Sequence, residues 1–355
     1  MAITAGMVKE LREMTGAGMM DCKKALSETN GDMDAAVEFL RKNGQAKAEK
    51  KAGRIAAEGI VKTVVKDNKA AIVEVNSETD FVAKNDEFQG FVETVVNQIV
   101  DSEAADMDAF MAEAWAADTT KTVKDALVEK IAVIGENLNI RRFEKVAADN
   151  GCVVSYIHGG GRIGVLVVAD TDVVNDDIKA CLKNVAMQVA AMRPVALDES
   201  SVSEETKKSE LEVAVAKTKE ELVEKAVNAA LKKAGINPAH VDSEEHIESN
   251  TKKGWLTPEQ AEEARNIKKT VGEEKAATLN PTMIQNIANG RLAKFFKENC
   301  LVDQEFQFGD GDKQTVAQYL ASQSKDLKMV AMIIHAVLPV SRVVNNKLLI
   351  YISYS

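Results

Sequence analysis

Apolar positions near the N-terminus follow helical spacing. Val8, Leu11 and Met14 lie three residues apart, which places them on one face of a helix. Two breaks of turn-forming residues, Thr-Gly-Ala-Gly and Thr-Asn-Gly-Asp, divide this part of the chain into short segments. The pattern therefore predicts three short helices packed as one small unit over residues 3–43.

The third of these helices is expected over Met33–Lys42. Asn43 and Gly44 follow it, and such a pair commonly ends a helix. The chain is then strongly basic as far as Arg54, which suggests a solvated linker helix. Residues 1–54 are therefore predicted to be a three-helix domain with its linker.

The period of the pattern changes to two after Gly59. Residues 60–65 and 71–75 alternate in the manner of strands on either side of a polar turn, and so predict a β-hairpin. An amphipathic helix is expected next, with apolar residues at helical spacing: Phe88, Phe91, Val92, Val95, Val96 and Ile99. Residues 55–150 form a first predicted subdomain of mixed helix and strand.

The same order of elements appears a second time. Residues 153–157 and 163–168 are predicted strands around a glycine-rich turn, and an amphipathic helix follows Asp176. The two units share few identical residues, so the repeat rests on the pattern. Residues 151–330 are predicted to form a second subdomain with a polar helical insertion at about 203–280, either a protruding hairpin or an inserted lobe.

The end of the chain differs in composition. Residues 329–355 contain no Asp or Glu. The apolar run Met329–Val340 is shorter than the roughly 20 residues that cross a membrane. Residues 331–355 are therefore predicted to be an atypical apolar tail, and no membrane association is expected.

Composition limits the classes of function. The net charge of −10 (45 basic against 55 acidic residues) argues against non-specific nucleic-acid binding. Four cysteines without close spacing fit reduced thiols better than disulfides or a zinc ribbon. The N-terminus is charged by its ninth residue and has no apolar signal region. A cytoplasmic protein is expected.

Motifs of catalysis are scarce. The four histidines show no metal-ligand spacing, and no nucleophile motif or phosphate-binding loop is present. Gly159–Gly161 lies between two predicted strands, where a hairpin turn requires a left-handed backbone. The sequence therefore favours a turn over a nucleotide site at these glycines.

Two short segments allow two interpretations each. In the segment 77–82, Asp80 completes a helix cap and Phe81 packs into the core, or Phe81 is an exposed anchor beside a charge. Met19 and Met20 cannot both face the core of one short helix, so at least one is expected at the surface. It is exposed there by chance or forms an adaptable binding surface.

Four segments in order resemble the bacterial elongation factor Ts family. Residues 11–26 resemble its N-terminal signature, and residues 74–84 resemble its second signature. Two further stretches match at 156–167 and 290–295. The resemblance implies a three-helix domain of the ubiquitin-associated type, then a duplicated α+β core with a protruding helical coiled coil.

The resemblance also implies a function: a guanine-nucleotide exchange factor for elongation factor Tu, with no bond-making chemistry. Such a factor needs no cofactor of its own and acts on the Mg²⁺-GDP of its partner. The implied contact residues fall in three groups: Thr79, Asp80, Phe81 and Val82 at the nucleotide domain, Arg12, Met19 and Met20 docking on the same domain, and His158 at another domain.

Two departures from the family pattern accompany the resemblance. The helical stretch at 225–280 is longer than the usual coiled coil. After Lys328 the charged strand and terminal module of the family are replaced by an apolar sequence, which predicts an altered C-terminus. An inert scaffold, or a hydrolase using Asp80 or His158, remain the competing hypotheses.

Overall fold

The computed structural model describes residues 3–309 and 313–337. They form two compact units: the chain up to Leu197 together with the chain from Gln304, and residues 198–303. The first unit combines helices with antiparallel sheets, whereas the second is helical. The predicted α+β class is confirmed.

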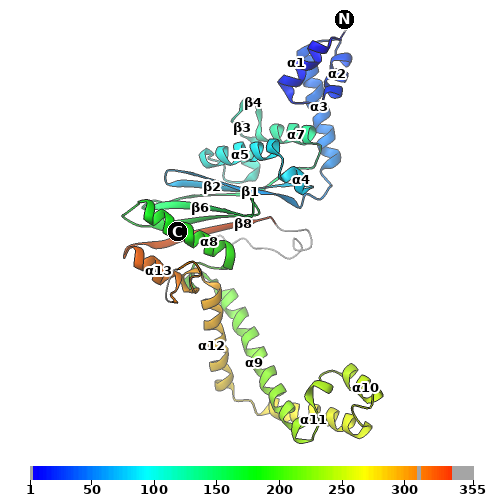
Figure 1. Cartoon of the computed structure of the whole chain (residues 1–355), viewed down its shortest axis with the longest axis vertical. Helices are drawn as coiled ribbons and strands as arrows, with labels where there is room; N and C mark the ends of the chain where they lie inside the picture. The colour runs from blue at the N-terminus through cyan, green and yellow to red at the C-terminus, as the bar shows by residue number, and fades with distance from the viewer. Residues whose placement is uncertain (1–2, 310–312, 338–355) are drawn as a thin grey trace. The chain divides into compact units, whose positions relative to one another are not determined.

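Three helices form the N-terminal part of the first unit (Figure 1): α1 (Ala5–Thr15), α2 (Met19–Glu28) and α3 (Met33–Lys51). Leu11, Cys22 and Leu26 are fully buried among them. The side chains of Thr4 and Asp32 cap α1 and α3 by accepting bonds from backbone N–H groups. Polar caps thus define the starts of α1 and α3, and apolar contacts hold the three helices together.

The third helix does not end at Asn43–Gly44 as predicted, but continues through Lys51. A Cβ atom on Gly44 would lie 3.5 Å from the Cβ of Ala132 in α7 (Val123–Ile134). Gly44 lies where α3 packs against α7. This tertiary packing outweighs the helix-ending tendency of the Asn-Gly pair.

Two three-stranded antiparallel sheets form the core, and both follow one plan. A hairpin leads to a helix, and a later strand pairs with the second strand of the hairpin. The first sheet has β1 (Glu58–Lys66), β2 (Lys69–Ser77) and β5 (Asn139–Ala147) with helix α5 (Asp86–Asp101). The second has β6 (Cys152–His158), β7 (Ile163–Asp170) and β8 (Lys328–Ala336) with helix α8 (Asp176–Met192).

The two sheets pack face to face, and α5 and α8 cover their outer faces (Figure 1). Ile72 of β2 and Leu166 of β7 lie in the layer between the sheets, whereas Val73 lies in the layer beneath α5. A Cβ atom on Gly164 would lie 2.4 Å from Cγ1 of Val61, so close approach of β7 to β1 requires glycine there. Strands buried on both faces explain their almost continuous apolar sequence.

The remaining elements of the first unit are short. They are α4 (Asp80–Ala83), α6 (Met107–Ala112), β3 (Ala114–Trp115), β4 (Asp118–Thr122) and α13 (Val316–Gln323). Trp115 and Phe110 pack with α5 and α7 in the core above the first sheet. All but α13 lie in the chain between β2 and β5, and α13 precedes β8.

The second unit contains the predicted insertion and extends beyond it. Its helices are α9 (Glu204–Lys233), α10 (Glu244–Lys252), α11 (Pro258–Ala277) and α12 (Pro281–Asn299). Both α11 and α12 pack along α9, and Nη1 of Arg291 lies 3.0 Å from Oε1 of Glu221. Leu231, Ile236 and Ile247 form a separate small core. The unit therefore includes α12 and reaches residue 303 rather than 280.

The strand β8 includes residues 331–336, the first part of the segment set apart as a tail. These residues pair with β7 from Ile163 to Val168 and bury Met332 and Ile333. An apolar segment without acidic residues is what a strand between two packed layers requires. The rest of that segment, residues 338–355, lies outside the described residues.

A buried polar cluster lies in the first unit where β2, β5 and β8 meet. Glu74 is fully buried, and its Oε2 accepts a 2.7 Å bond from Nε of Arg142. Arg142 also donates to the carbonyl of Ala336. His335 is 2% exposed, and neither ring nitrogen has a hydrogen-bond partner among the described residues. Burial lowers the pKa of His335 to about 3, and the charge of Arg142 acts in the same direction.

We expect His335 to make the first unit sensitive to acid. Its pKa is lower in the folded than in the unfolded protein, so its contribution is complete above pH 6.5 and is lost as the pH falls towards 3. At pH 5 the loss is about 2 kcal/mol of unfolding free energy. Urea unfolding at pH 7 and pH 5 measures this loss. The measurement uses a Trp255→Phe background, in which the fluorescence of Trp115 reports on the first unit alone.

The matched variant is His335→Leu. Both proteins lose the same unfolding free energy through the protonation of carboxyl groups. The difference between the two losses is therefore the contribution of the imidazole. If both proteins lose the same free energy between pH 7 and pH 5, the buried neutral imidazole is not the cause.

Candidate functional site

The segment Thr79–Val82 contains the N-cap and the first residues of the short helix α4, and it carries one exposed aromatic ring. Thr79 caps α4, accepting a 3.3 Å bond from the amide of Val82. Val82 and Ala83 pack on the core of the first sheet, whereas Phe81 is 82% exposed. The interpretation in which Phe81 packs into the core is therefore wrong. The buried neighbours anchor the turn, and the phenyl ring projects into solvent.

A charge pair adjoins the exposed ring. Oδ2 of Asp80 lies 2.8 Å from Nζ of Lys84, one helical turn later. The hydrogen bond from Lys84 lowers the pKa of Asp80, and the charge of Lys84 adds to this effect. Asp80 is thus a carboxylate at neutral pH, beside a large apolar side chain.

A carboxylate from a distant part of the chain holds this segment. Oε2 of Glu136 accepts bonds of 3.0 Å from the amides of both Glu78 and Thr79, and Oε1 accepts a 2.6 Å bond from the Thr79 hydroxyl. Glu136 follows Gly135, whose left-handed backbone ends α7. The sequence analysis missed Glu136, because its local pattern carries no sign of a partner almost sixty residues away.

The glycine turn lies at the same end of the first unit. Gly159, Gly160 and Gly161 all have positive φ angles, from 60° to 96°, which confirms a hairpin turn. Nη2 of Arg162 lies 2.7 Å from Oε2 of Glu58. Glu58 also pairs with Ser77 in the sheet. Glu58 therefore connects the glycine turn with the start of the Thr79–Val82 segment.

His158 is exposed at the start of this turn. Its Nδ1 lies 3.0 Å from the hydroxyl of Tyr156. The hydroxyl of Tyr156 orients the imidazole.

The predicted docking residues of the N-terminal domain are at the surface. Met19 and Met20 are 58% and 76% exposed at the start of α2, and Arg12 is exposed near the end of α1. Met14, which the helical spacing placed with the apolar stripe, is 59% exposed. Met14, Met19 and Met20 lie on both sides of the loop between α1 and α2, and we call them the methionine patch. Flexible thioether side chains suit an adaptable surface.

The methionine patch and the Thr79–Val82 segment lie on elements that meet at α7. α7 packs against α3 of the N-terminal domain. It also lies close to the loop between α1 and α2, because a Cβ atom on Gly16 would lie 3.8 Å from Cγ2 of Val133 in α7. The residue Glu136, which binds Thr79, follows the end of the same helix. A single helix therefore supports both groups of predicted contact residues.

Three further features bear on other kinds of site: metal-ligating side chains, the cysteines and long apolar helices. Among the described residues, no three His, Cys, Asp or Glu side chains gather in a way that could hold a metal ion. All four cysteines are buried, and burial raises the pKa of Cys300 to about 12, far from a reactive thiolate. No helix in the described part of the chain is long and apolar enough to cross a membrane.

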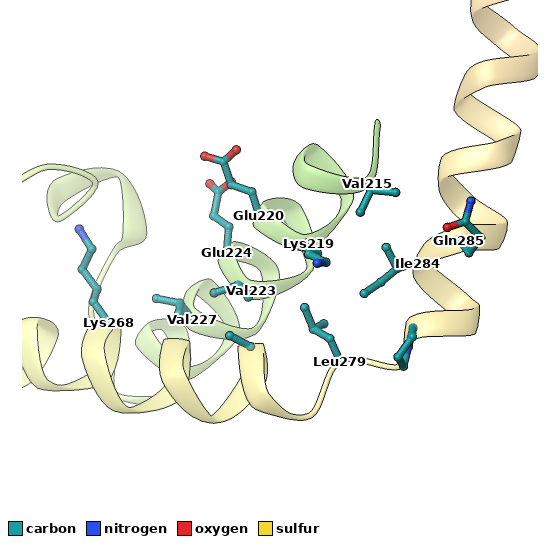
Figure 2. A pocket seen from close by; sticks show the side chains of 12 residues that line it. Val215, Lys219, Glu220, Val223, Glu224, Val227, Lys268, Leu279, Ile284 and Gln285 are labelled. Atoms are coloured by element: carbon teal, nitrogen blue, oxygen red, sulfur yellow. The ribbon is translucent and has the colours of Figure 1, made fainter. Parts of the chain in front are cut away.

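A groove of about 870 Å³ lies within the second unit, between α9, α11 and the start of α12. Val223, Val227 and Ile284 form its apolar floor, and Glu220 and Glu224 project from α9 at its edge (Figure 2). None of the residues predicted for the functional site lines it. The mixed charges at its edge indicate no particular ligand.

Comparisons with known proteins point to one family. A family model described as Elongation factor TS matches residues 78–236 and 223–337, a match that continues past Lys328 and includes β8. A curated protein of Phocaeicola vulgatus named Elongation factor Ts is 45% identical over 93% of this chain and 97% of its own length. The protein of the same name from Clostridium tetani is 50% identical over 92% of this chain and 88% of its own.

Proposed function

Because this chain belongs to the elongation factor Ts family of translation elongation factors, we propose that it promotes release of GDP from elongation factor Tu. The partner, the nucleotide and Mg²⁺ enter with this proposal. No cofactor held by this chain is required, since Mg²⁺ and nucleotide both belong to the partner. Nucleic acid and membrane take no part in the proposed step.

The observation that carries the proposal is the exposure of Phe81. At 82%, Phe81 is the most exposed large apolar side chain in the described part of the chain, whereas its neighbours Val82 and Ala83 anchor the backbone. Burying such a ring in a partner is worth about 1.5–3 kcal/mol, and aromatic anchors of this kind dominate many interfaces. The charged Asp80 beside it would enter the partner with the ring.

The proposed mechanism is a thermodynamic coupling. Phe81 and Asp80 push into the nucleotide domain of the partner and disturb the region that binds Mg²⁺ and phosphate. Whatever affinity for GDP the factor removes, GDP removes equally from the affinity for the factor. An acceleration of GDP release by about 10³ requires the barrier to fall by roughly 4 kcal/mol. Burial of the ring and loss of Mg²⁺ contacts are the two sources of that energy.

The test is release of a fluorescent GDP from elongation factor Tu in the presence of Mg²⁺. Addition of this chain at substoichiometric amounts is expected to accelerate release with turnover. A folded, monodisperse sample that leaves the release rate unchanged would refute the proposal. An inert scaffold would give that negative result.

Shortening the methionine patch is expected to weaken docking more than it slows exchange. Met19→Ala together with Met20→Ala should raise the concentration for half-maximal exchange about tenfold, equivalent to about 1.4 kcal/mol. The maximal rate should change little, because contacts made equally before and during release alter only affinity. Titrating the factor in the GDP-release assay measures both quantities.

The control for this pair is Met192→Ala, a 45% exposed methionine at the end of α8. It should leave both quantities unchanged. The double variant could instead lower the maximal rate and leave the concentration for half-maximal exchange unchanged. That result would contradict a docking role for the methionine patch.

A further inference from the structure

The exposed ring of Phe81 has almost no packing of its own to fix its direction. α4 is a single turn of four residues, and an isolated turn of that length is unstable because helix initiation is unfavourable. The amides of Glu78 and Thr79 precede the helix and cannot be satisfied within it. Val82 and Ala83 anchor the C-terminal side of the turn in the core. On its N-terminal side, the direction of Phe81 depends on what binds the backbone at Glu78 and Thr79.

Glu136 satisfies both amides and the Thr79 hydroxyl with one carboxylate. Hydrogen bonds to an ionised acceptor are the stronger kind. The contact is also reciprocal, because the amide of Asn137 donates a 2.7 Å bond to Oε1 of Glu78. Two consecutive residues after α7 thus bind two consecutive residues before α4.

The contact also ties the segment to a rigid support. Glu136 and Asn137 lie between α7 and β5, and the side chain of Asn137 donates a 2.8 Å bond to the carbonyl of Arg54 in the linker. Nη1 of Arg54 lies 3.5 Å from Oε2 of Glu78. The linker, the end of α7 and the start of α4 are therefore fixed to one another.

We propose that Glu136 is a positioning residue for nucleotide exchange, one that fixes Thr79 and hence the direction of Phe81 before the partner binds. The inference rests on the proposed function. A ring already held in its binding direction avoids the cost of ordering the segment at the step, after docking, in which it enters the nucleotide domain. The energy of its burial then acts on that step, and so on the maximal rate. If the carboxylate is removed, the ring still enters the partner, but part of its binding energy is used to order the segment.

The test compares Glu136→Ala with Glu136→Gln in the GDP-release assay. Glu136→Ala is expected to lower the maximal release rate about tenfold and to change half-saturation less than threefold. Glu136→Gln should stay within threefold of the unchanged protein, because its amide oxygen accepts from both backbone amides while its NH₂ group donates to the Thr79 hydroxyl. A tenfold loss in Glu136→Gln would show that charge, and not position, is what matters.

The double variant with Phe81→Ala separates positioning from general stability. If Glu136 acts through Phe81, Glu136→Ala should cause no further loss of rate in the Phe81→Ala background. Equal losses in both backgrounds would overturn the inference. The control is Glu113→Ala, which removes another partly buried carboxylate that accepts a 2.7 Å bond from the Ser102 hydroxyl. It should leave the rate unchanged.

A measurement without the partner keeps the inference testable by itself. Amide hydrogen exchange over residues 77–84 should become faster in Glu136→Ala and remain unchanged in Glu113→Ala and Phe81→Ala. Unchanged exchange in Glu136→Ala would refute the positioning role, whatever the rates. If the unchanged protein does not accelerate GDP release, the proposed function fails, whereas faster amide exchange in Glu136→Ala would still stand as a finding about the segment.

Discussion

Replacing Phe81 with alanine is expected to lower the rate of GDP release from elongation factor Tu by a factor on the order of 10². Truncation of a central aromatic anchor costs about 2–4 kcal/mol at protein interfaces, and each 1.4 kcal/mol is a factor of ten in rate. Adding Asp80→Ala should abolish the remaining acceleration. The GDP-release assay in Mg²⁺ measures both variants against the unchanged protein.

The fold should survive these changes. Phe81 is 82% exposed, and among the described residues Asp80 forms an ion pair only with the exposed Lys84. The free energy of unfolding should therefore shift by less than about 0.5 kcal/mol. The control is Val173→Ala, since Val173 is 49% exposed and follows β7 at the end away from the glycine turn. A Phe81→Ala protein that exchanges at the original rate would refute the role proposed for the ring.

Reciprocity gives an equilibrium test of the same residue. The unchanged protein should bind nucleotide-free elongation factor Tu more tightly than the GDP-bound form, by the factor by which it weakens GDP binding. Phe81→Ala should reduce this preference and not merely weaken both affinities equally. An equal loss for the two forms would make Phe81 a simple docking contact.

Replacing Glu74 with alanine is expected to cost about 3 kcal/mol of stability in the first unit. Glu74 is fully buried and binds Arg142 at 2.7 Å, and it also accepts a 3.1 Å bond from Asn76. Removing one partner of a buried pair leaves the other charge without compensation, which typically costs 3–5 kcal/mol. Arg142 retains some solvent contact, so the lower figure applies.

Urea unfolding followed through Trp115 in a Trp255→Phe background measures this loss in the first unit alone. The control is Glu93→Ala, which breaks the exposed pair with Lys62 and should cost less than about 1 kcal/mol. In the double variant Glu74→Met with Arg142→Met, much of the stability should return, because the buried pair is removed as a whole. Arg141, whose Nη1 also lies 3.5 Å from Oε1 of Glu74, keeps its contact with solvent. Equal losses for Glu74→Ala and Glu93→Ala would contradict a buried pair.

Several features of the fold were predictable because their signals are local. The period-two runs gave the hairpin β1–β2, and the apolar spacing after Asp86 gave α5 with its buried face. The repeated order of elements predicted the duplicated core without any need for sequence identity. The positive φ angles at Gly159–Gly161 follow from glycines between two strands. In each case the responsible residues are neighbours along the chain.

Other features were misjudged because contacts distant in sequence decide them. α3 continues to Lys51 because it packs on α7 beyond the Asn43–Gly44 pair. Met14 follows helical spacing but no element covers it, so it is exposed. The apolar residues 331–336 read as a tail, although they complete the second sheet beside β7. Spacing shows which residues share a face, but only packing shows whether another element covers that face.

The sequence by itself determined the α+β class, the repeated core and, through its resemblance, the family and the segment that contains Phe81. It left open whether Phe81 is buried or exposed, because both interpretations obey the same local pattern. The tertiary structure decided this point: Val82 and Ala83 take the places in the core, and the ring faces solvent. It alone brought Glu136 to Thr79, since a hydrogen bond between residues far apart in the chain leaves no trace in the spacing of either segment.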